Sequence, residues 1–210
     1  MNKNPLVCLC SLLAPIAPAH AAYTLINGNF EDTSGTFPAG WTTVGTVNNP
    51  GSAGFPGSAA DAFLDPGESI TQDFSGGAGT ATAENYNFQL DFAFRTSSIS
   101  TATNQRIRLR DNNNTGDLIT LGFATTASGG GAALSYYNGG TWTTAVDLGI
   151  ATGTTYHVRV SGFNLDQAGR YYTIGLSTDG ISFTTTANIT AFHHNTAGAG
   201  GRDVESNRFE

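Results

Sequence analysis

Residues 85–95 read NYNFQLDFAFR, and this stretch decides the fold. Large apolar side chains occupy every second position, and small or polar residues alternate with them. Successive side chains of a β-strand point to opposite faces, so this order predicts a strand with one buried and one wet face. The predicted inward set is Tyr86, Phe88, Leu90, Phe92 and Phe94, and the outward set is Asn87, Gln89, Asp91, Ala93 and Arg95.

The same alternation recurs along the chain, with turn sequences between the segments. The predicted inward residues are Ile107 and Leu109; Ile119, Leu121 and Phe123; Tyr156, Val158 and Val160; and Tyr172, Ile174 and Leu176. Turns are predicted at 111–117 (DNNNTGD), 138–140 (NGG) and Asp179-Gly180, since Asn, Asp and Gly tolerate positive φ. Residues 22–210 show no helical periodicity. We therefore predict an all-β fold: one antiparallel β-sandwich domain, jelly-roll-like, over residues 22–210.

Residues 1–21 have the pattern of a helical signal peptide. Lys3 precedes an apolar run, and Ala19-His20-Ala21 fits the small-x-small cleavage rule. A membrane anchor is the competing interpretation, but Pro15 and Pro18 interrupt the run. Both cysteines of the chain lie within this segment, so residues 22–210 contain no disulfide. The pattern predicts a secreted protein.

The charge balance argues against two classes of partner. The chain has a net charge of −7, one lysine and no basic run. Nucleic acid and anionic membrane surfaces attract clustered positive charge, so neither is expected as a partner. No stretch after residue 21 is long and apolar enough to cross a bilayer.

Catalytic and metal motifs are weak. A glycosidase on a sandwich needs two carboxylates across a cleft, but the odd spacing of Glu84 and Asp91 places them on opposite faces of a strand. Gly-x-Ser-x-Gly and His-Glu-x-x-His are absent, which favours a non-catalytic protein over a glycosidase. Residues 111–117 resemble the start of a calcium loop, but Gly122 stands where the glutamate belongs, which favours a hairpin turn. His193-His194 is interpreted as surface histidine.

Two sets of side chains are candidates for ligand binding. Arg106, Arg108, Arg110 and Arg159, with His157, Asp91 and Tyr171, form either a shallow groove for an acidic glycan or a solvated face with ion pairs such as Asp91–Arg108. The aromatic residues near turns either stack on sugar rings or anchor the core and loops. The candidate ligand-binding residues are Trp41, Trp142, Tyr136, Tyr137, Tyr171, Arg108 and Arg159.

The stretches LINGNFED and PAGW within residues 25–41, GESITQDF (67–74) and the final ESNRFE carry a family resemblance. They resemble the terminal strands of family 4 and family 9 type carbohydrate-binding modules, which share the galactose-binding-like jelly roll. The resemblance implies polysaccharide binding and one structural calcium. Glu31 would be a calcium ligand, with Asn29 adding a backbone carbonyl; the C-terminal aspartate of the family has no counterpart before Glu210.

The overall pattern also resembles secreted bacterial proteins of the PEP-CTERM class, which an exosortase sorts to the cell surface. That resemblance implies a sorting tail after residue 210, where the given sequence stops. The expected function is therefore a secreted, non-catalytic module that binds extracellular polysaccharide at the cell surface or matrix. The alternative is a structural surface protein with no specific glycan ligand.

Overall fold

The fold is taken from a computed structural model. It describes residues 42–46, 69–73, 87–96, 99, 101, 105–111, 117–165, 168–193 and 204–209. The predicted signal peptide (1–21), Asn29, Glu31, Trp41 and His194 lie outside these ranges. Within the ranges, no helix is long and apolar enough to span a membrane.

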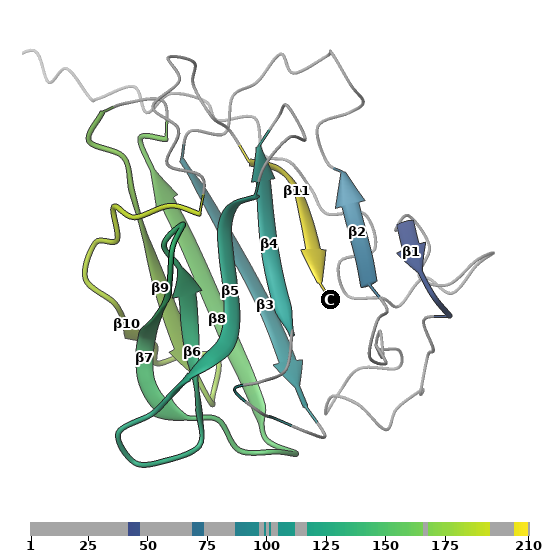
Figure 1. Ribbon diagram of the computed structural model, residues 1–210, viewed down its shortest axis with the longest axis vertical. Coiled ribbons are helices and arrows are strands. Elements are labelled where there is room, and N and C mark those ends of the chain that lie inside the picture. The colour runs from purple at the N-terminus through teal and green to yellow at the C-terminus, as the bar shows by residue number, and fades with distance from the viewer. Residues whose placement is uncertain are drawn as a thin grey trace, which may run out of the picture.

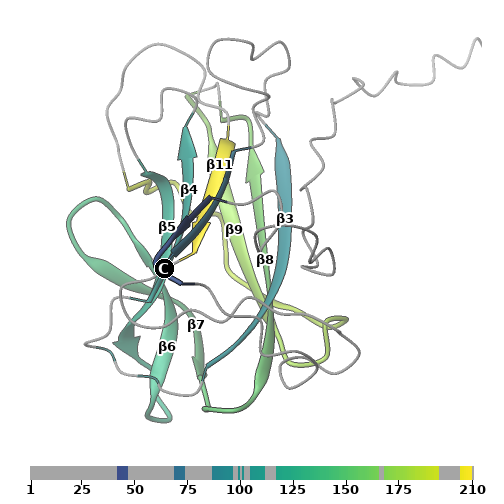
Figure 2. The same cartoon turned by 90° about the vertical axis from the view of Figure 1, so that its right-hand side faces the viewer.

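The described chain forms two antiparallel sheets, as the sequence predicts (Figure 1). The larger sheet has the order β1 (Thr42–Val44), β2 (Ser69–Asp73), β11 (Val204–Phe209), β4 (Arg106–Asp111), β5 (Asp117–Thr126), β6 (Ala132–Tyr137) and β7 (Trp142–Gly149). The smaller sheet has the order β10 (Thr184–Thr185), β9 (Tyr171–Ser177), β8 (Thr155–Phe163) and β3 (Phe88–Arg95). Figure 2 shows β4 and β5 in one layer with β3 and β8 in the other. The all-β sandwich is confirmed.

The strand β3 contains most of the stretch that decides the fold, and its burial alternates at every residue. Phe88, Leu90, Phe92 and Phe94 are half-buried, while the residues between them are exposed. The strand pairs with β8 in a regular antiparallel register. Because β8 alternates in the same way, each strand turns one apolar side toward the other sheet.

The core lies between the two sheets and is built from aliphatic and aromatic side chains of both. The Phe94 ring lies 5.1 Å from that of Phe123, and the Tyr136 ring lies edge-on to that of Tyr172 at 6.3 Å. The largest fully buried side chains are Tyr172, Phe192, Leu109, Leu118, Ile119, Leu121, Leu134, Leu165, Ile174, Leu176 and Val158. All the described members of the predicted inward sets contribute to this core or pack against it.

The strand β5 departs from its prediction, because both of its faces are covered. Leu118 and Thr120 are buried as fully as Ile119 and Leu121. His193 lies beside β5: its N–H donates to the Leu118 carbonyl at 3.1 Å, and its Nδ1 lies 2.7 Å from Thr120 Oγ1. A residue far along the sequence therefore contacts Thr120 on the face that periodicity alone leaves wet.

The predicted turns are present where the structure describes them. The Asn138 side-chain oxygen accepts from the amides of Gly140 (3.0 Å) and Thr141 (2.8 Å), and Gly139 has a φ of 91°. Gly180 has a φ of 71° in the connection between β9 and β10. These positive φ values explain why glycine occupies both positions, since most other residues adopt a positive φ only with strain.

Candidate functional site

The candidate ligand-binding residues that the structure describes fall on three separate surfaces. Tyr137, Trp142 and Arg108 lie on the outer face of the larger sheet, opposite the inward Ile107 and Leu121 in strand alternation. Arg159 and Tyr171 lie on the outer face of the smaller sheet. Tyr136 lies between the two sheets, at their edge. The first surface gathers the most of them, and we call it the Trp142 face: Arg106, Arg108, Arg110, Asp117, Thr120, Tyr137, Trp142 and His193.

Two aromatic rings form the centre of the Trp142 face. Tyr137 and Trp142 are directly paired across β6 and β7, so their side chains leave the sheet on the same side. Their ring centroids are 5.4 Å apart, with the planes inclined at 59°. The six-membered end of the indole lies against Gly122, where a Cβ would stand 2.9 Å from Trp142 Cη2. A glycine on β5 thus lets the indole lie close to the sheet.

Three arginines of β4 border these rings, and one carboxylate joins two of them. The guanidinium carbon of Arg106 lies 5.9 Å from the Trp142 ring centroid, within cation–π range. Asp117 Oδ2 accepts from Arg108 Nη1 at 3.0 Å, and Asp117 Oδ1 lies 3.4 Å from Arg110 Nε. The side chains of the two arginines are only 23% and 26% exposed, so these ion pairs are partly shielded from water.

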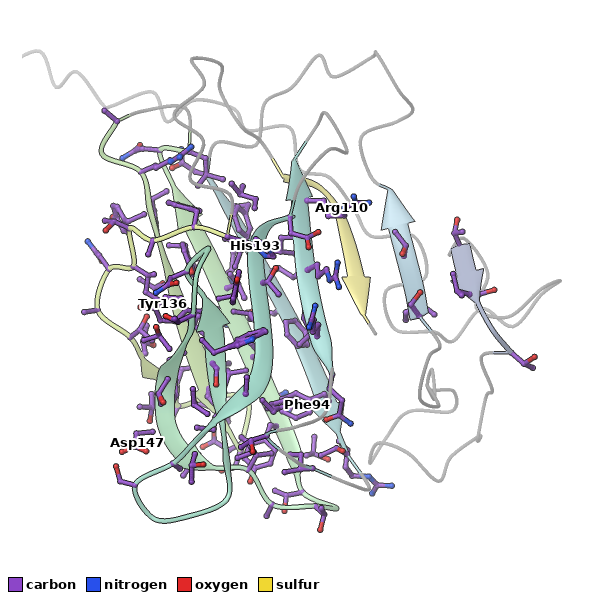
Figure 3. The ribbon with its side chains drawn as sticks, in the orientation of Figure 1. Phe94, Arg110, Tyr136, Asp147 and His193 are labelled. Carbon is purple, nitrogen blue, oxygen red and sulfur yellow. The ribbon has the colours of Figure 1, made fainter. Side chains whose placement is uncertain are left out.

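His193 also belongs to this outer face, where it is partly buried among other side chains. Its ring lies 4.7 Å from that of Tyr137, and its Nδ1 lies 2.7 Å from Thr120 Oγ1. Its side chain is 22% exposed. Figure 3 shows His193 beside β5, with Arg110 near the same end of the larger sheet. No sequence pattern signals this placement, because Thr120 and His193 are 73 residues apart.

Asp117 and Thr120, the described polar neighbours of His193, do not form a catalytic triad with the histidine. In a triad, the nucleophile and the carboxylate bond to opposite nitrogens of the imidazole. Here Thr120 Oγ1 and Asp117 Oδ2 both approach Nδ1, at 2.7 and 3.9 Å. This geometry holds the ring in place and provides no relay from carboxylate to hydroxyl.

The second surface is the outer face of the smaller sheet, which carries Arg159 and Tyr171. Arg159 Nε donates to Asp91 Oδ1 at 2.7 Å and Nη2 donates to Oδ2 at 3.3 Å. This pairing corrects the expected ion pair between Asp91 and Arg108, because β3 pairs with β8 while β4 belongs to the other sheet. The hydrogen bond to Asp91 raises the pKa of Arg159 above its usual value.

Arg159 and Tyr171 each lie beside an aromatic ring. The Arg159 guanidinium lies 4.4 Å from the centroid of the Phe183 ring, and Tyr171 stacks on Phe163 with centroids 4.8 Å apart. A hollow of about 250 Å³ lies beside the first pair, lined by Asp91, Phe92, Ala93, His157, Val158, Arg159, Gly180 and Phe183. Its described lining pairs one arginine with one carboxylate, whereas the described side chains of the Trp142 face include three arginines and one carboxylate.

Tyr136 lies apart from both faces, between the sheets at the edge formed by β7. The predicted row of sugar-stacking rings is therefore divided among three places. Among the described residues, no group of three His, Cys, Asp or Glu side chains is close enough to hold a metal ion. The calcium prediction at Glu31 and Asn29 falls outside the described residues.

Comparison with protein-family models, with curated proteins and with solved structures found no match for this chain.

Proposed function

We propose that this chain is a secreted, non-catalytic module that binds extracellular polysaccharide at a bacterial cell surface or matrix. The observation that carries the proposal is the Trp142 face. There, Tyr137 and Trp142 lie side by side on the outside of a sheet, with guanidinium groups beside them. Rings of this kind combine a large apolar surface with a polar group, which suits the mixed polarity of a sugar.

The charges of the face favour an acidic polysaccharide. Arg106, Arg108 and Arg110 supply three guanidinium groups, against the one carboxylate of Asp117 among the described side chains of the face. Guanidinium forks match carboxylate and sulfate groups in geometry and charge. A uronic acid or sulfated sugar would place its anionic group near the arginines and its ring near Trp142.

Affinity electrophoresis in gels containing polygalacturonate tests the proposal. We expect the protein to be retarded, and Trp142→Ala to weaken binding about fivefold or more, as truncation of an aromatic anchor commonly does. Tyr171→Ala, on the opposite sheet, is the matched control and should bind as the wild type does. Absence of binding to acidic and neutral polysaccharides alike, with and without calcium, would overturn the proposal.

A structural surface or matrix protein without a specific glycan is the second candidate. One observation favours it: Tyr137 already contacts both Trp142 and His193, so the rings also stabilise the sheet. The two candidates differ in Trp142→Ala. A scaffold loses stability without any change in polysaccharide binding, whereas a binding module loses retardation while remaining folded.

The proposed calcium and the sorting to the cell surface rest on the family resemblances alone. Glu31 would bind the ion through its carboxylate and Asn29 through its carbonyl, which are the oxygen ligands that calcium prefers. Thermal unfolding in calcium and in EGTA tests the site. A bound structural ion raises the unfolding temperature, and Glu31→Gln should remove that difference.

A further inference from the structure

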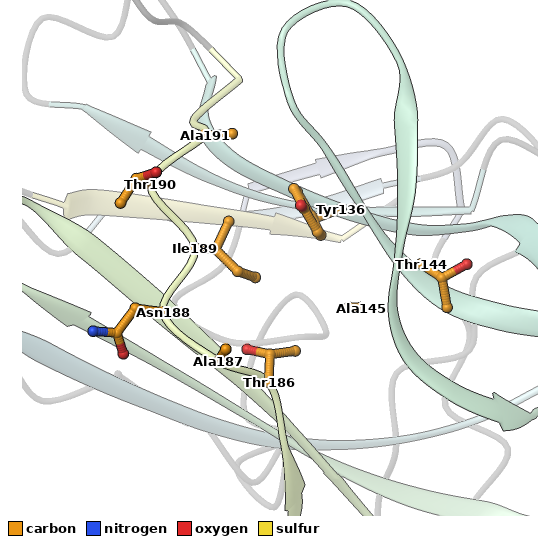
Figure 4. Close-up of a pocket in the computed structure, with 9 residues that line it drawn as sticks. All are labelled: Tyr136, Thr144, Ala145, Thr186, Ala187, Asn188, Ile189, Thr190 and Ala191. Atoms are coloured by element: carbon orange, nitrogen blue, oxygen red, sulfur yellow. The ribbon is translucent and has the colours of Figure 1, made fainter.

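A groove of about 370 Å³ opens at the edge of the sandwich, away from the Trp142 face. One wall is residues 186–191, the segment after β10, and the other is Thr144 and Ala145 of β7. Tyr136 lies between these walls, and Ile189 is part of the first wall (Figure 4). Its volume falls within the range of small-molecule sites, about 300–1,000 Å³.

The walls of the groove are fixed by hydrogen bonds. The Ile189 N–H donates to the Tyr172 carbonyl at 2.8 Å, and the Tyr172 N–H donates back at 3.0 Å. On the other wall, the Thr144 hydroxyl donates to Thr125 Oγ1 at 2.8 Å, and Thr125 Oγ1 lies 2.6 Å from Ser135 Oγ. A ligand would therefore meet a preformed site and lose little free energy in ordering it.

Polar groups that can form further hydrogen bonds border this space. Tyr136 is half-buried and brings to the lining a phenolic hydroxyl, which can both donate and accept. Thr186 Oγ1 accepts from the Ile174 amide at 3.1 Å and keeps its own proton to donate. The N–H and C=O of Ile189 are bonded to Tyr172, and Asn188 adds a side-chain amide to the lining.

Among the residues that the structure describes, the lining carries no carboxylate, guanidinium, ammonium or imidazole group. Instead it combines an aromatic ring, three alanines, an isoleucine, three threonines and an asparagine. We propose that this groove binds a neutral saccharide, with a sugar ring against Tyr136 and its hydroxyls bonded to the side chains of Thr186 and Asn188. The inference rests on the proposed carbohydrate-binding function, to which it adds a second site of different charge preference.

An extended peptide added to the edge of β7 is the competing occupant, and the shape of that edge disfavours it. The pairing of β6 with β7 shifts register twice, between Ala133 and Leu134 and between Leu134 and Ser135. Such bulges twist a strand and interrupt the even spacing of backbone groups that strand addition requires. A saccharide needs no such regular spacing, so the irregular edge suits it better.

Calorimetric titration with xylohexaose, cellohexaose and mannohexaose tests the groove. We expect at least one of these to bind, and Ala187→Leu, which fills the groove from one wall, to weaken binding about tenfold or more. Ala145→Leu, from the other wall, should act in the same direction. Ala151→Leu places the same side chain at an exposed loop position and is the matched control. Urea unfolding of each variant separates a filled groove from a damaged fold.

The outcomes distinguish the groove from the Trp142 face. Loss of neutral hexaose binding in Ala187→Leu, with polygalacturonate binding kept, supports the groove. Failure of all three hexaoses to bind overturns it, even if polygalacturonate binds and the proposed function stands. Hexaose binding that Trp142→Ala removes and Ala187→Leu leaves intact also overturns it. So does binding of an alternating Thr-Val heptapeptide in place of the hexaoses.

Discussion

Gly122 of β5 lies beneath the indole of Trp142, and a Cβ at this position would stand 2.9 Å from Cη2 and 3.0 Å from the Gln105 carbonyl oxygen. Gly122→Ala should therefore push the indole off the sheet and disturb the adjacent strand. We expect a loss of about 1–3 kcal/mol in the free energy of unfolding, as for overpacking elsewhere. Urea unfolding gives this value, and a change in the fluorescence of Trp142 reports the displaced ring.

Gly129→Ala is the matched control for this substitution. Gly129 lies in the turn between β5 and β6, has no positive φ, and a Cβ there meets no atom within 4 Å. Its free energy of unfolding should change by less than about 0.5 kcal/mol. Equal effects at both positions would show that the contact between Gly122 and Trp142 has no special role.

The alternation that begins in residues 85–95 and recurs along the chain was sufficient to predict the sandwich. It could not predict which strands are neighbours. Asp91 and Arg108 both face outward, as expected, yet they lie on opposite sheets. Asp91 meets Arg159 because β3 pairs with β8, which is 68 residues away in the sequence. Periodicity reports which face a side chain occupies, whereas the partner on that face depends on topology.

Tyr172→Phe tests the hydrogen bond made by the hydroxyl of this buried tyrosine. The Tyr172 hydroxyl donates to the Ala191 carbonyl at 3.1 Å, and its side chain is fully buried. Removing the hydroxyl should lower the free energy of unfolding by about 1–2 kcal/mol, since the partly buried Ala191 carbonyl loses its donor. Tyr171→Phe, on the outer face of the same strand, should cost less, and urea unfolding compares the two.

The same tyrosine makes stability depend on alkaline pH. Burial raises the pKa of Tyr172 far above its usual value of 10.0. The unfolded chain therefore releases the phenolic proton first, so this contribution is complete below pH about 10 and falls as the pH rises above it. Tyr172→Phe should show a shallower loss of stability over that alkaline range. An identical slope in both proteins would contradict the buried, protonated phenol.

Asp179 gives the opposite pH dependence in the connection after β9. Hydrogen bonds from the Ser182 amide, the Ser177 hydroxyl and the Ile181 amide lower the pKa of Asp179 to about 2. The stabilisation is complete above the ordinary value of 3.8 and is lost as the pH falls toward 2. Asp179→Asn should therefore lose less stability than the wild type between pH about 4 and 2.

Thermal unfolding at several acidic pH values measures this difference. Hydrogen bonds from Ser128 also lower the pKa of Asp147, so Asp179→Asn should remove only part of the acid dependence. The double variant with Asp147→Asn should remove more of it. No change in acid dependence in either variant would show that these carboxylates do not keep their turn contacts in solution.

The composition of the candidate site was only partly predictable. Trp142 and Tyr137 were candidates as aromatic residues near turns, and Arg108 was a candidate as an outward arginine of a strand; the three share a face. His193 could not be expected there, because it reaches Thr120 only when the segment after β10 returns to β5. The same contact sets the His193 ring against Thr120, which is buried on β5. Tyr136, adjacent to Tyr137, points to the other side because strand neighbours alternate.

Asp117 connects the stability of the Trp142 face to its proposed ligand. Its carboxylate is 10% exposed and contacts both Arg108 and Arg110. Asp117→Asn removes the charge from both contacts and should cost about 1–3 kcal/mol in the free energy of unfolding, measured in urea. The same change removes a negative charge from the face that is proposed to receive an acidic sugar.

We therefore expect Asp117→Asn to bind polygalacturonate several-fold more tightly than the wild type while being less stable. The gain should shrink at high salt, because screening weakens the charge interactions of a partly exposed face. Asp91→Asn, on the other sheet, removes the same charge far from the face and should leave binding unchanged. Weaker binding in Asp117→Asn would mean that the carboxylate serves to position the arginines for the ligand rather than to compete with it.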